Sequence, residues 1–527
     1  MSDKGAFLGK NGEQDFMGPF EANSPQVNDF FQKILKIGLE FRAQPHVRDD
    51  ARPTPSSVQF SNLPKTGAAY DDLLAQFRDI ARGSVHWGSP NWVGFPDSGN
   101  SVPSLGAALM IPLLGQNLCN QDVTSPSATF TEMEVVHWLR DNLGYTVPSM
   151  YNNALEIGGI LTVGGSLSNA IALIAAREAT FPGSGLDGLP VLPRDVRVLV
   201  PDVIEHYSIR SALSSLSLGG ANVVRVPVDD NFRIILPELE RCIDEERAAG
   251  RHVMACVAYA GDSRTMCIDN LSEIADILQK KKVWFHVDAC HGSCLAFSRT
   301  HRHKLKGIEK ADSVTIDPHK ALWVTYTCSF VLFKDPATLA KVGATTELIL
   351  KTQWSLGQIT PFIGSKAFDA LKLWATMKYF GQEGIERLID DRLKLTAQIQ
   401  EEVRRNPDLI LLNKTDINAC IMLFMPESMQ RRGTRLQPSE MDKLNEINKT
   451  IKMTIQNGGK FFIHGFPLRR VPHSLIPENH PVFVLRTMNG NPLTTIDNVR
   501  LLLAEVVELG HKLIAEKGLK ASLSAKL

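Results

Sequence analysis

The sequence predicts an α/β protein in which a mainly parallel sheet is followed by a smaller α+β unit. The first observation is an alternation of short apolar runs of strand length with amphipathic runs of helical length. Strands separated by helices are joined by crossovers, and crossovers make neighbouring strands parallel. The strands are expected at residues 196–200, 223–226, 254–259 and 283–287, and the helices between them at 208–218, 235–248 and 271–281.

The second observation is a change of pattern after these strands. Apolar runs at 313–316 and 328–333 are separated by a short link, so one antiparallel pair is expected there. A long helical stretch at 367–406 then leads to the smaller unit. Its strands are expected at 419–424 and 483–487, and its helices at 439–457 and 496–517.

The third observation is length, because 527 residues exceed what a single hydrophobic core usually supports. Residues 27–41 and 70–81 place apolar side chains at helical spacing ahead of the sheet. Such helices cannot bury an apolar stripe alone, so they should pack on the main body or on a second subunit. We expect an N-terminal arm and dimerisation segment at 1–110, a large domain at 111–385 and a small C-terminal domain at 386–527.

Charge and cysteine content exclude several classes of partner. Lysine plus arginine and aspartate plus glutamate number 57 each, so no overall field attracts nucleic acid or anionic lipid. The start of the chain lacks a secretion signal, and the apolar stretch 102–118 is interrupted by prolines and glycines. The eight cysteines form no CxxC pair, and several lie in strand-like runs as buried free thiols do. We expect a cytoplasmic protein with no nucleic-acid or membrane partner.

Two charged residues follow neighbouring predicted strands. Asp288 ends the run 283–287, and Lys320 comes shortly after the run 313–316. In open α/β sheets, ligands bind outside the carboxyl ends of the strands. A lysine that forms a Schiff base and a carboxylate that holds a pyridinium nitrogen are what pyridoxal phosphate (PLP) requires. A lone lysine at a strand end is usually a solvated surface residue, so this hypothesis depends on the residues around the pair.

Further residues support a PLP site. The segment 164–169 (GGSLSN) opens a predicted helix, and the free N–H groups and dipole of a helix start favour a phosphate. Glycine-serine helix starts are also common capping devices. His319 is placed to touch the phosphate, and His206 follows a strand and could stack on the ring. A polar loop histidine is the alternative for His206.

Together these segments resemble a known family. The sequences GGSLSN at 164–169, HVDA at 286–289 and ADSVTIDPHK at 311–320 are similar to those of the group II PLP-dependent amino-acid decarboxylases, which include the glutamate and aromatic amino-acid decarboxylases. The resemblance covers residues 91–372 and weakens toward the C-terminus. It implies fold type I of the PLP enzymes, with a seven-stranded type of sheet, and a homodimer with active sites at the subunit interface.

The resemblance also implies a role for each site residue. Lys320 carries the internal aldimine, Asp288 pairs with the ring nitrogen and His206 stacks on the ring. Ser263 lies near the phenolic oxygen of the ring, Cys290 lies under the ring, and Arg486 holds a substrate carboxylate. Apart from the resemblance, Trp92 and Phe95 would suit an aromatic or apolar substrate side chain if they line the pocket. The phosphate ligands are expected to be Gly165, Ser166, Leu167, Ser168, Asp317 and His319.

The chain departs from the family pattern at several positions. Asp262-Ser263 replaces a usual pair of threonines, and Cys290 replaces a usual alanine. A metal site made of Cys290, His291 and Cys294 would lack a fourth ligand, so no metal is expected. The largest departure is that residues 327–378 contain no tyrosine, although typical relatives use a loop tyrosine there to protonate the carbanion.

The main hypothesis is therefore a PLP-dependent carboxy-lyase that removes the α-carboxylate of an L-amino acid as CO₂ and yields an amine. The missing tyrosine leaves open a decarboxylation coupled to oxidation that yields an aldehyde, or another Cα reaction such as C–C cleavage or decarboxylative condensation. It also leaves open another proton donor, such as His206, His291 or a group of the partner chain. A non-catalytic binding protein with the same fold is the third hypothesis.

Overall fold

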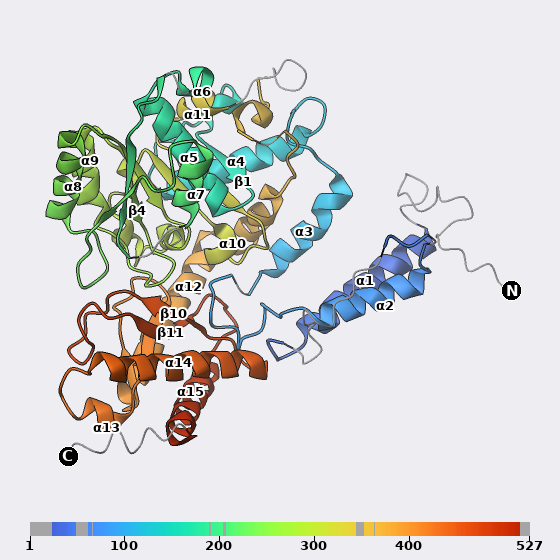
Figure 1. Cartoon of the computed structure of the whole chain (residues 1–527). Helices are drawn as coiled ribbons and strands as arrows, with labels where there is room; N and C mark the ends of the chain where they lie inside the picture. The colour runs from blue at the N-terminus through green and yellow to red at the C-terminus, as the bar shows by residue number, and fades with distance from the viewer. Residues whose placement is uncertain are drawn as a thin grey trace.

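The computed structural model shows a large unit built on a seven-stranded sheet, a smaller unit beside it and a projecting pair of N-terminal helices (Figure 1). The residues that it describes are 24–48, 62–65, 67–97, 99–188, 191–203, 207–343, 353–362 and 364–516.

The large sheet is mainly parallel, as predicted. Its strand order is β1-β7-β6-β5-β4-β2-β3. The pairs from β3 through β6 are parallel, whereas β7 pairs antiparallel with both β6 and β1. The short link after β6 therefore makes the expected antiparallel pair. The strands are β1 (Gly159–Thr162), β2 (Val196–Pro201), β3 (Val223–Val226), β4 (His252–Tyr259), β5 (Trp284–Asp288), β6 (Ser313–Ile316) and β7 (Ser329–Phe333).

Helices cover both faces of this sheet because successive side chains of a buried strand point to opposite sides. In β2, Val198 and Val200 belong to a core cluster with residues of α5 and α7, whereas Leu199 belongs to the cluster that contains residues of α8 and α9. These helices are α5 (Gly165–Thr180), α7 (Tyr207–Ser215), α8 (Leu236–Ala248) and α9 (Leu271–Lys281), and α4 (Pro126–Asn142) packs near β1.

The smaller unit contains an antiparallel sheet of order β10-β11-β9-β8, covered by two long helices. The helix α12 (Ala370–Arg405) joins the units and is interrupted at Gly381, whose φ of 60° is not helical. This helix spans residue 385, and the predicted domain boundaries stay a prediction. The elements are β8 (Leu409–Leu411), β9 (Ala419–Phe424), β10 (His464–Leu468), β11 (Val482–Met488), α14 (Pro438–Gly458) and α15 (Ile496–Glu516). Shorter helices are α6 (Ser184–Asp187), α10 (Pro318–Ala321), α11 (Thr338–Val342) and α13 (Glu427–Gln430).

The N-terminal helices α1 (Pro25–Arg42) and α2 (Tyr70–Arg82) pack on each other and project from the body (Figure 1). Ser24 begins α1 by accepting a hydrogen bond from the N–H of Val27, and the rings of Phe30 and Tyr70 lie 4.1 Å apart. Both helices were predicted from their apolar spacing. The apolar stretch at 102–118 forms a third helix, α3 (Val102–Leu114), despite Pro112.

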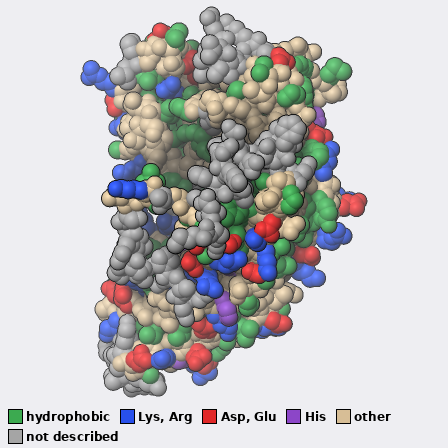
Figure 2. Space-filling model, turned by 90° about the vertical axis from the view of Figure 1, so that its right-hand side faces the viewer, with side chains coloured by type: hydrophobic (Ala, Val, Ile, Leu, Met, Phe, Trp, Pro, Cys, Tyr) green, Lys and Arg blue, Asp and Glu red, His purple; other side chains and the backbone are tan. Residues whose placement is uncertain are grey.

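The surface of the described residues carries mixed charge. In Figure 2, basic and acidic side chains are interspersed on the visible face, as expected from the equal numbers of each. Among the described residues, no helix is long and apolar enough to cross a membrane. All eight cysteines are buried and free, as predicted, and two of them, Cys256 in β4 and Cys420 in β9, lie in strands.

Candidate functional site

A cavity of about 620 Å³ opens at the carboxyl edge of the large sheet. The parallel pairing of β5 with β6 brings Asp288 opposite Thr315, so both strands end at the same edge. Helix α10 follows β6 at once and carries Lys320 into the same cavity. The other lining residues come from the starts of α5 and α7, the ends of β4 and β5 with the loops after them, the segments on both sides of α10, and the segment before α3. They include Asp97, Gly164, Gly165, Ser166, Leu167, Asn169, Tyr207, Tyr259, Asp262, Ser263, Arg264, Cys290, His291, Asp317, His319, Tyr326 and Thr327.

Asp288 is buried, and hydrogen bonds from Asn169 and Cys290 help to hold it. The Asn169 amide donates to its Oδ2 at 2.9 Å, and the Cys290 N–H donates to its Oδ1 at 3.1 Å. Asn169 is fixed in turn, because its Oδ1 lies 3.1 Å from Nε2 of His286. This chain of contacts orients the Asp288 carboxylate toward the cavity that both Asp288 and Asn169 line. A carboxylate in this setting can hold a protonated ring nitrogen.

The first turn of α5 forms another wall of the cavity. The N–H groups of a first helical turn lack partners inside the helix and favour an anion. Gly165 leaves room there, since a Cβ at this position would lie 2.7 Å from Oδ2 of Asp317 and 2.9 Å from Sγ of Cys290. The Ser166 hydroxyl hydrogen-bonds the Tyr207 hydroxyl at 3.2 Å. This end of the cavity can therefore cradle a phosphate.

Lys320 and Asp317 form an ion pair at 2.7 Å within the cavity. Burial lowers the pKa of the Lys320 amine, but the Asp317 carboxylate and other acidic neighbours outweigh this effect, so the net shift is upward. His319 lies on the same turn, and its Nδ1 donates to the carbonyl of Cys328 at 2.7 Å. The lysine is thus the group in this cavity that can bond covalently to an aldehyde.

The remaining predicted residues occupy different positions. His206 lies outside the described residues. Ser263 and Cys290 line the cavity, but the Ser168 hydroxyl is buried against Thr162 at 2.7 Å and is not part of the lining. The assigned roles of these residues stay predictions.

Arg486, Trp92 and Phe95 lie together behind the cavity lining. The Arg486 guanidinium is buried and donates to the carbonyls of Gly94, at 2.9 Å, and Ser263. Burial lowers the pKa of Arg486 to about 10. Trp92 stacks on Phe462 with ring centroids 3.9 Å apart. None of the three is among the residues that line the cavity, so their role in substrate binding stays a prediction.

The structure adds residues that the sequence did not indicate. Asn169 belongs to the GGSLSN segment, but nothing in its type showed that it would fix Asp288. Asp97 and Tyr326 come from segments far apart in the chain, and both line the cavity, where burial, followed by the charge of Asp97, raises the pKa of Tyr326. Asp97 comes two residues after Phe95, which was predicted to line the pocket, and this was the one available signal.

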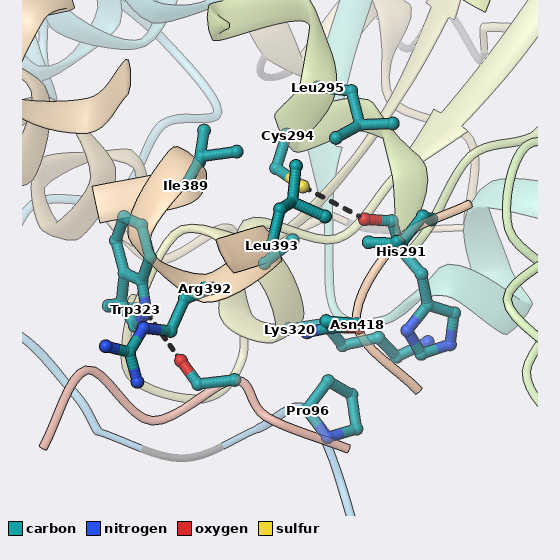
Figure 3. Close-up of a pocket in the computed structure, with 13 residues that line it drawn as sticks. Pro96, His291, Cys294, Leu295, Lys320, Trp323, Ile389, Arg392, Leu393 and Asn418 are labelled. Carbon is teal, nitrogen blue, oxygen red and sulfur yellow. Dashed lines mark hydrogen bonds between the residues drawn. The ribbon is translucent and has the colours of Figure 1, made fainter. Parts of the chain in front are cut away.

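A second, much smaller cavity lies on another side of Lys320 (Figure 3). Its volume is about 30 Å³, which suits one water molecule rather than a substrate. Leu295, Ile389 and Leu393 form its apolar wall, and Trp323 donates from Nε1 to the carbonyl of Gly490 at 2.8 Å. This packing fixes the surroundings of Lys320 and leaves the larger cavity as the candidate active site.

The residues of the larger cavity fit PLP. The cavity has the volume of a small-molecule site, with an anion cradle at α5, a carboxylate at Asp288 and an amine at Lys320. Asp317 Oδ1 and His291 Nδ1 are buried without a hydrogen-bond partner among the described residues, so both atoms can form hydrogen bonds with a bound ligand. No group of three or more His, Cys, Asp or Glu side chains able to hold a metal ion occurs in the part of the chain that the structure describes.

Comparison with known proteins supports this assignment. Aspartate 1-decarboxylase of Aliivibrio fischeri is 29% identical over 501 residues, which cover 91% of this chain and 90% of that protein. Cysteine sulfinic acid decarboxylase of Mus musculus is 29% identical over 459 residues, which cover 86% of this chain and 88% of that protein.

Solved structures show the same fold. The apo form of mouse CSAD superposes with a TM-score of 0.82 at 26% identity, covering 92% of this chain and 99% of that chain. Oryza sativa TDC with PLP and tryptamine shares the fold, with a TM-score of 0.81 at 20% identity, covering 94% of this chain and all (100%) of that chain. The prediction of fold type I is confirmed.

The model of the pyridoxal-dependent decarboxylase conserved domain matches residues 57–424, which is more than half of the chain. This match confirms the resemblance seen in the sequence, the PLP cofactor and the enzyme class of carboxy-lyase. The chain therefore belongs to the pyridoxal-dependent decarboxylase family.

Proposed function

We propose that this enzyme removes the α-carboxylate of an L-amino acid as CO₂ and releases the corresponding amine. The observation that carries the proposal is the meeting of three elements in one cavity: the β5 end with Asp288, the α10 turn with Lys320, and the start of α5. Bound PLP supplies an electron sink for the electron pair that stays on Cα when the carboxylate leaves.

The residues of the chain divide the remaining work. Lys320 would hold the cofactor through its amine, at the position where the amine of the substrate would enter. The Asp288 carboxylate keeps a proton on the ring nitrogen, and its hydrogen bonds to Asn169 and Cys290 hold it in place. The first turn of α5 and His319 bind the phosphate, and His206 is proposed to stack on the ring.

The substrate is proposed to be a single L-amino acid whose side chain extends toward Ser263 and Arg264. These residues line the cavity, and the Arg486 guanidinium lies behind them against the Ser263 carbonyl. The relatives described above act on acidic amino acids, aspartate and cysteine sulfinic acid, by their names. Besides Lys320, the described lining contains the cation Arg264, which could attract a side chain of that charge and makes acidic amino acids the first candidates.

A homodimer with active sites at the subunit interface is also proposed. Helices α1 and α3 expose large apolar side chains, and exposed patches of this kind mark association surfaces. Helices α1 and α2 project from the body, so one side of this pair faces away from it (Figure 1). The exposed residues are Phe31, Leu35 and Leu39 on α1, and Leu109, Met110, Leu113 and Leu114 on α3. The eight free, buried cysteines support a reducing compartment such as the cytoplasm.

A panel of L-amino acids tests the proposed reaction. The panel includes aspartate, cysteine sulfinate, 2,4-diaminobutyrate and tryptophan, and each reaction is followed for CO₂, amine, aldehyde and hydrogen peroxide. We expect CO₂ and amine in equal amounts from one member of the panel. Equal amounts of CO₂, aldehyde and peroxide would instead support the oxidative alternative, which the tyrosine-free stretch 327–378 motivates. A holoenzyme that releases no CO₂ from any L-amino acid would contradict the proposal.

A further inference from the structure

Decarboxylation leaves a carbanion that needs a proton, and residues 327–378 contain no tyrosine to supply it. Three tyrosines from other segments line the cavity: Tyr207, Tyr259 and Tyr326. Tyr207 lies at the phosphate end, because its hydroxyl hydrogen-bonds Ser166. Tyr259 lies at the nitrogen end, because it pairs with Asp288 across β4 and β5. Tyr326 lies six residues after Lys320, on the segment that carries the lysine.

Tyr326 is positioned by its contacts in the cavity. Its ring packs against His319, with ring centroids 4.8 Å apart, and meets Trp87 edge-on at 5.8 Å. Burial, followed by the charge of Asp97, raises the pKa of its hydroxyl, and the charges of Lys320 and Asp317 also act on it. Oδ1 of Asp97 is buried and has no hydrogen-bond partner among the described residues. The phenol, half of whose residue surface is exposed, therefore lies in the cavity close enough to Lys320 and Asp97 to feel both charges.

The backbone that carries Tyr326 is anchored on both sides. Buried Lys372 donates from Nζ to the carbonyls of Tyr326, at 3.2 Å, and Thr327, at 2.8 Å. The Thr325 N–H donates to the Ser104 hydroxyl at 2.9 Å, which ties the segment to α3. Such anchoring suits a proton donor, because proton transfer requires the donor to lie within hydrogen-bond distance of the atom that receives the proton.

Protonation states favour Tyr326 over His291, the other candidate in the described lining. Burial and the nearby Lys320 amine lower the pKa of His291 well below its usual value, so its ring is neutral near neutral pH. Burial and the Asp97 carboxylate raise the pKa of Tyr326, so the phenol keeps its proton. Burial also raises the pKa of Asp97, while the nearby Lys320 amine opposes this shift.

We propose that the Tyr326 hydroxyl, backed by Asp97, donates the proton that replaces the carboxylate on Cα; this inference rests on the proposed decarboxylation. The Cα–carboxylate bond breaks and CO₂ leaves with no bonding electrons. The electron pair that remains on Cα takes the phenolic proton, and solvent water reprotonates the phenolate oxygen. The step consumes no oxidant, so it yields an amine. Tyr326 is a catalytic residue in this scheme, and Asp97 is a positioning residue that acts through it.

The test compares Tyr326→Phe and Asp97→Asn with the wild-type holoenzyme, using the amino acid from which the wild type releases CO₂ fastest. Both variants should keep the visible absorbance of bound PLP. Loss of a proton donor lowers rates by about 10²–10⁴-fold, and we expect amine formation by Tyr326→Phe to fall in this range. The longer-lived carbanion should react with dissolved dioxygen, so the ratio of aldehyde and peroxide to amine should rise in both variants.

Tyr379→Phe is the matched control, because Tyr379 lies on α12 with 72% of its surface exposed, and its rate and products should not change. An unchanged amine rate and product ratio in Tyr326→Phe would overturn the assignment. If that variant does not fold, an unchanged product ratio in Asp97→Asn overturns it instead. A wild-type enzyme that releases no CO₂ from any L-amino acid would overturn the proposed function and this assignment with it. If the wild type is active and both variants keep its amine rate and product ratio, only this assignment is overturned.

Discussion

Asp288 is oriented by residues that are themselves fixed, which is why one carboxylate at a strand end can serve a cofactor. Its partner Asn169 is held by His286, whose Nδ1 lies 2.9 Å from the Ser313 hydroxyl on β6. The chain of contacts therefore connects α5, β5 and β6. Small displacements of the Asp288 carboxylate should therefore lower activity, because the residues that hold a catalytic group set its geometry.

A residue-scale prediction concerns the pH dependence of stability. Burial, followed by the charge of Arg486, lowers the pKa of His464 from 6.5 to about 3. Because the folded state favours the neutral ring, the unfolded chain binds a proton first as the pH falls. Burial of the neutral His464 ring therefore contributes fully to the free energy of unfolding above pH 6.5, and this contribution is lost as the pH falls toward 3.

Urea unfolding at a series of pH values measures this effect. The free energy of unfolding of His464→Gln should fall less steeply than that of the wild type across this pH range. His303→Gln, on an exposed turn, is the control and should keep the wild-type slope. Equal slopes for the wild type and His464→Gln would show that His464 does not contribute.

At the same scale, the sequence predicted the site residues that lie in recognisable local motifs. Asp288 and Lys320 were recognised because each follows a strand and because their motifs are specific. Asp97 and Tyr326 were not recognised, because an aspartate in a Gly/Pro-rich loop and a tyrosine after a turn have no distinctive local pattern. Their contact depends on how the segment before α3 packs against the segment after α10, which no local pattern encodes.

At the scale of elements, the start of α5 depends on the absence of a side chain at Gly165. A Cβ there would lie 2.7 Å from Asp317 Oδ2 and 2.9 Å from Cys290 Sγ. Gly165→Ala should therefore shift the phosphate cradle. Overpacking of this kind costs about 1–3 kcal/mol, which corresponds to a Kd for PLP raised roughly 5- to 150-fold.

Titration of the apoenzyme with PLP, followed by visible absorbance, measures this change. Gly458→Ala is the matched control, because no atom lies within 4 Å of a Cβ at that position. Its Kd for PLP should equal that of the wild type. An unchanged Kd in Gly165→Ala would place the phosphate elsewhere.

Elements with regular periodicity were predictable and irregular ones were not. The parallel strands and the helices α8 and α9 emerged from simple alternation, and β7 was expected as an antiparallel neighbour of β6. The helix α3 was not predicted, because Gly106 and Pro112 interrupt its apolar run. The strand β10 was missed because Gly465 and Pro467 are atypical of strands, and only its pairing with β11 makes it one.

At the scale of the whole molecule, the exposed apolar face of α3 should be buried in a homodimer. Leu113 is 51% exposed, and a buried carboxylate at its position would lack a partner and oppose association. Leu113→Glu should therefore shift a dimer toward monomers and reduce the catalytic rate, because the proposed active sites lie at the interface.

Sedimentation of the holoenzyme over a range of concentrations measures the association. The control is Leu501→Glu, which changes a leucine on α15 that is 56% exposed and far from α3 in the fold, and it should remain dimeric. A wild type that sediments as a monomer, or a fully dimeric Leu113→Glu, would contradict the proposed interface.

The central claim is that Lys320 holds PLP in the cavity between Asp288 and the start of α5. Reduction of the PLP-loaded enzyme with borohydride, followed by digestion and mass spectrometry, identifies the lysine that bears the cofactor. We predict a phosphopyridoxyl group on the peptide that contains Lys320, and no label on the corresponding peptide of Lys320→Ala. A label on another lysine, or no label on the loaded wild-type enzyme, would contradict the claim.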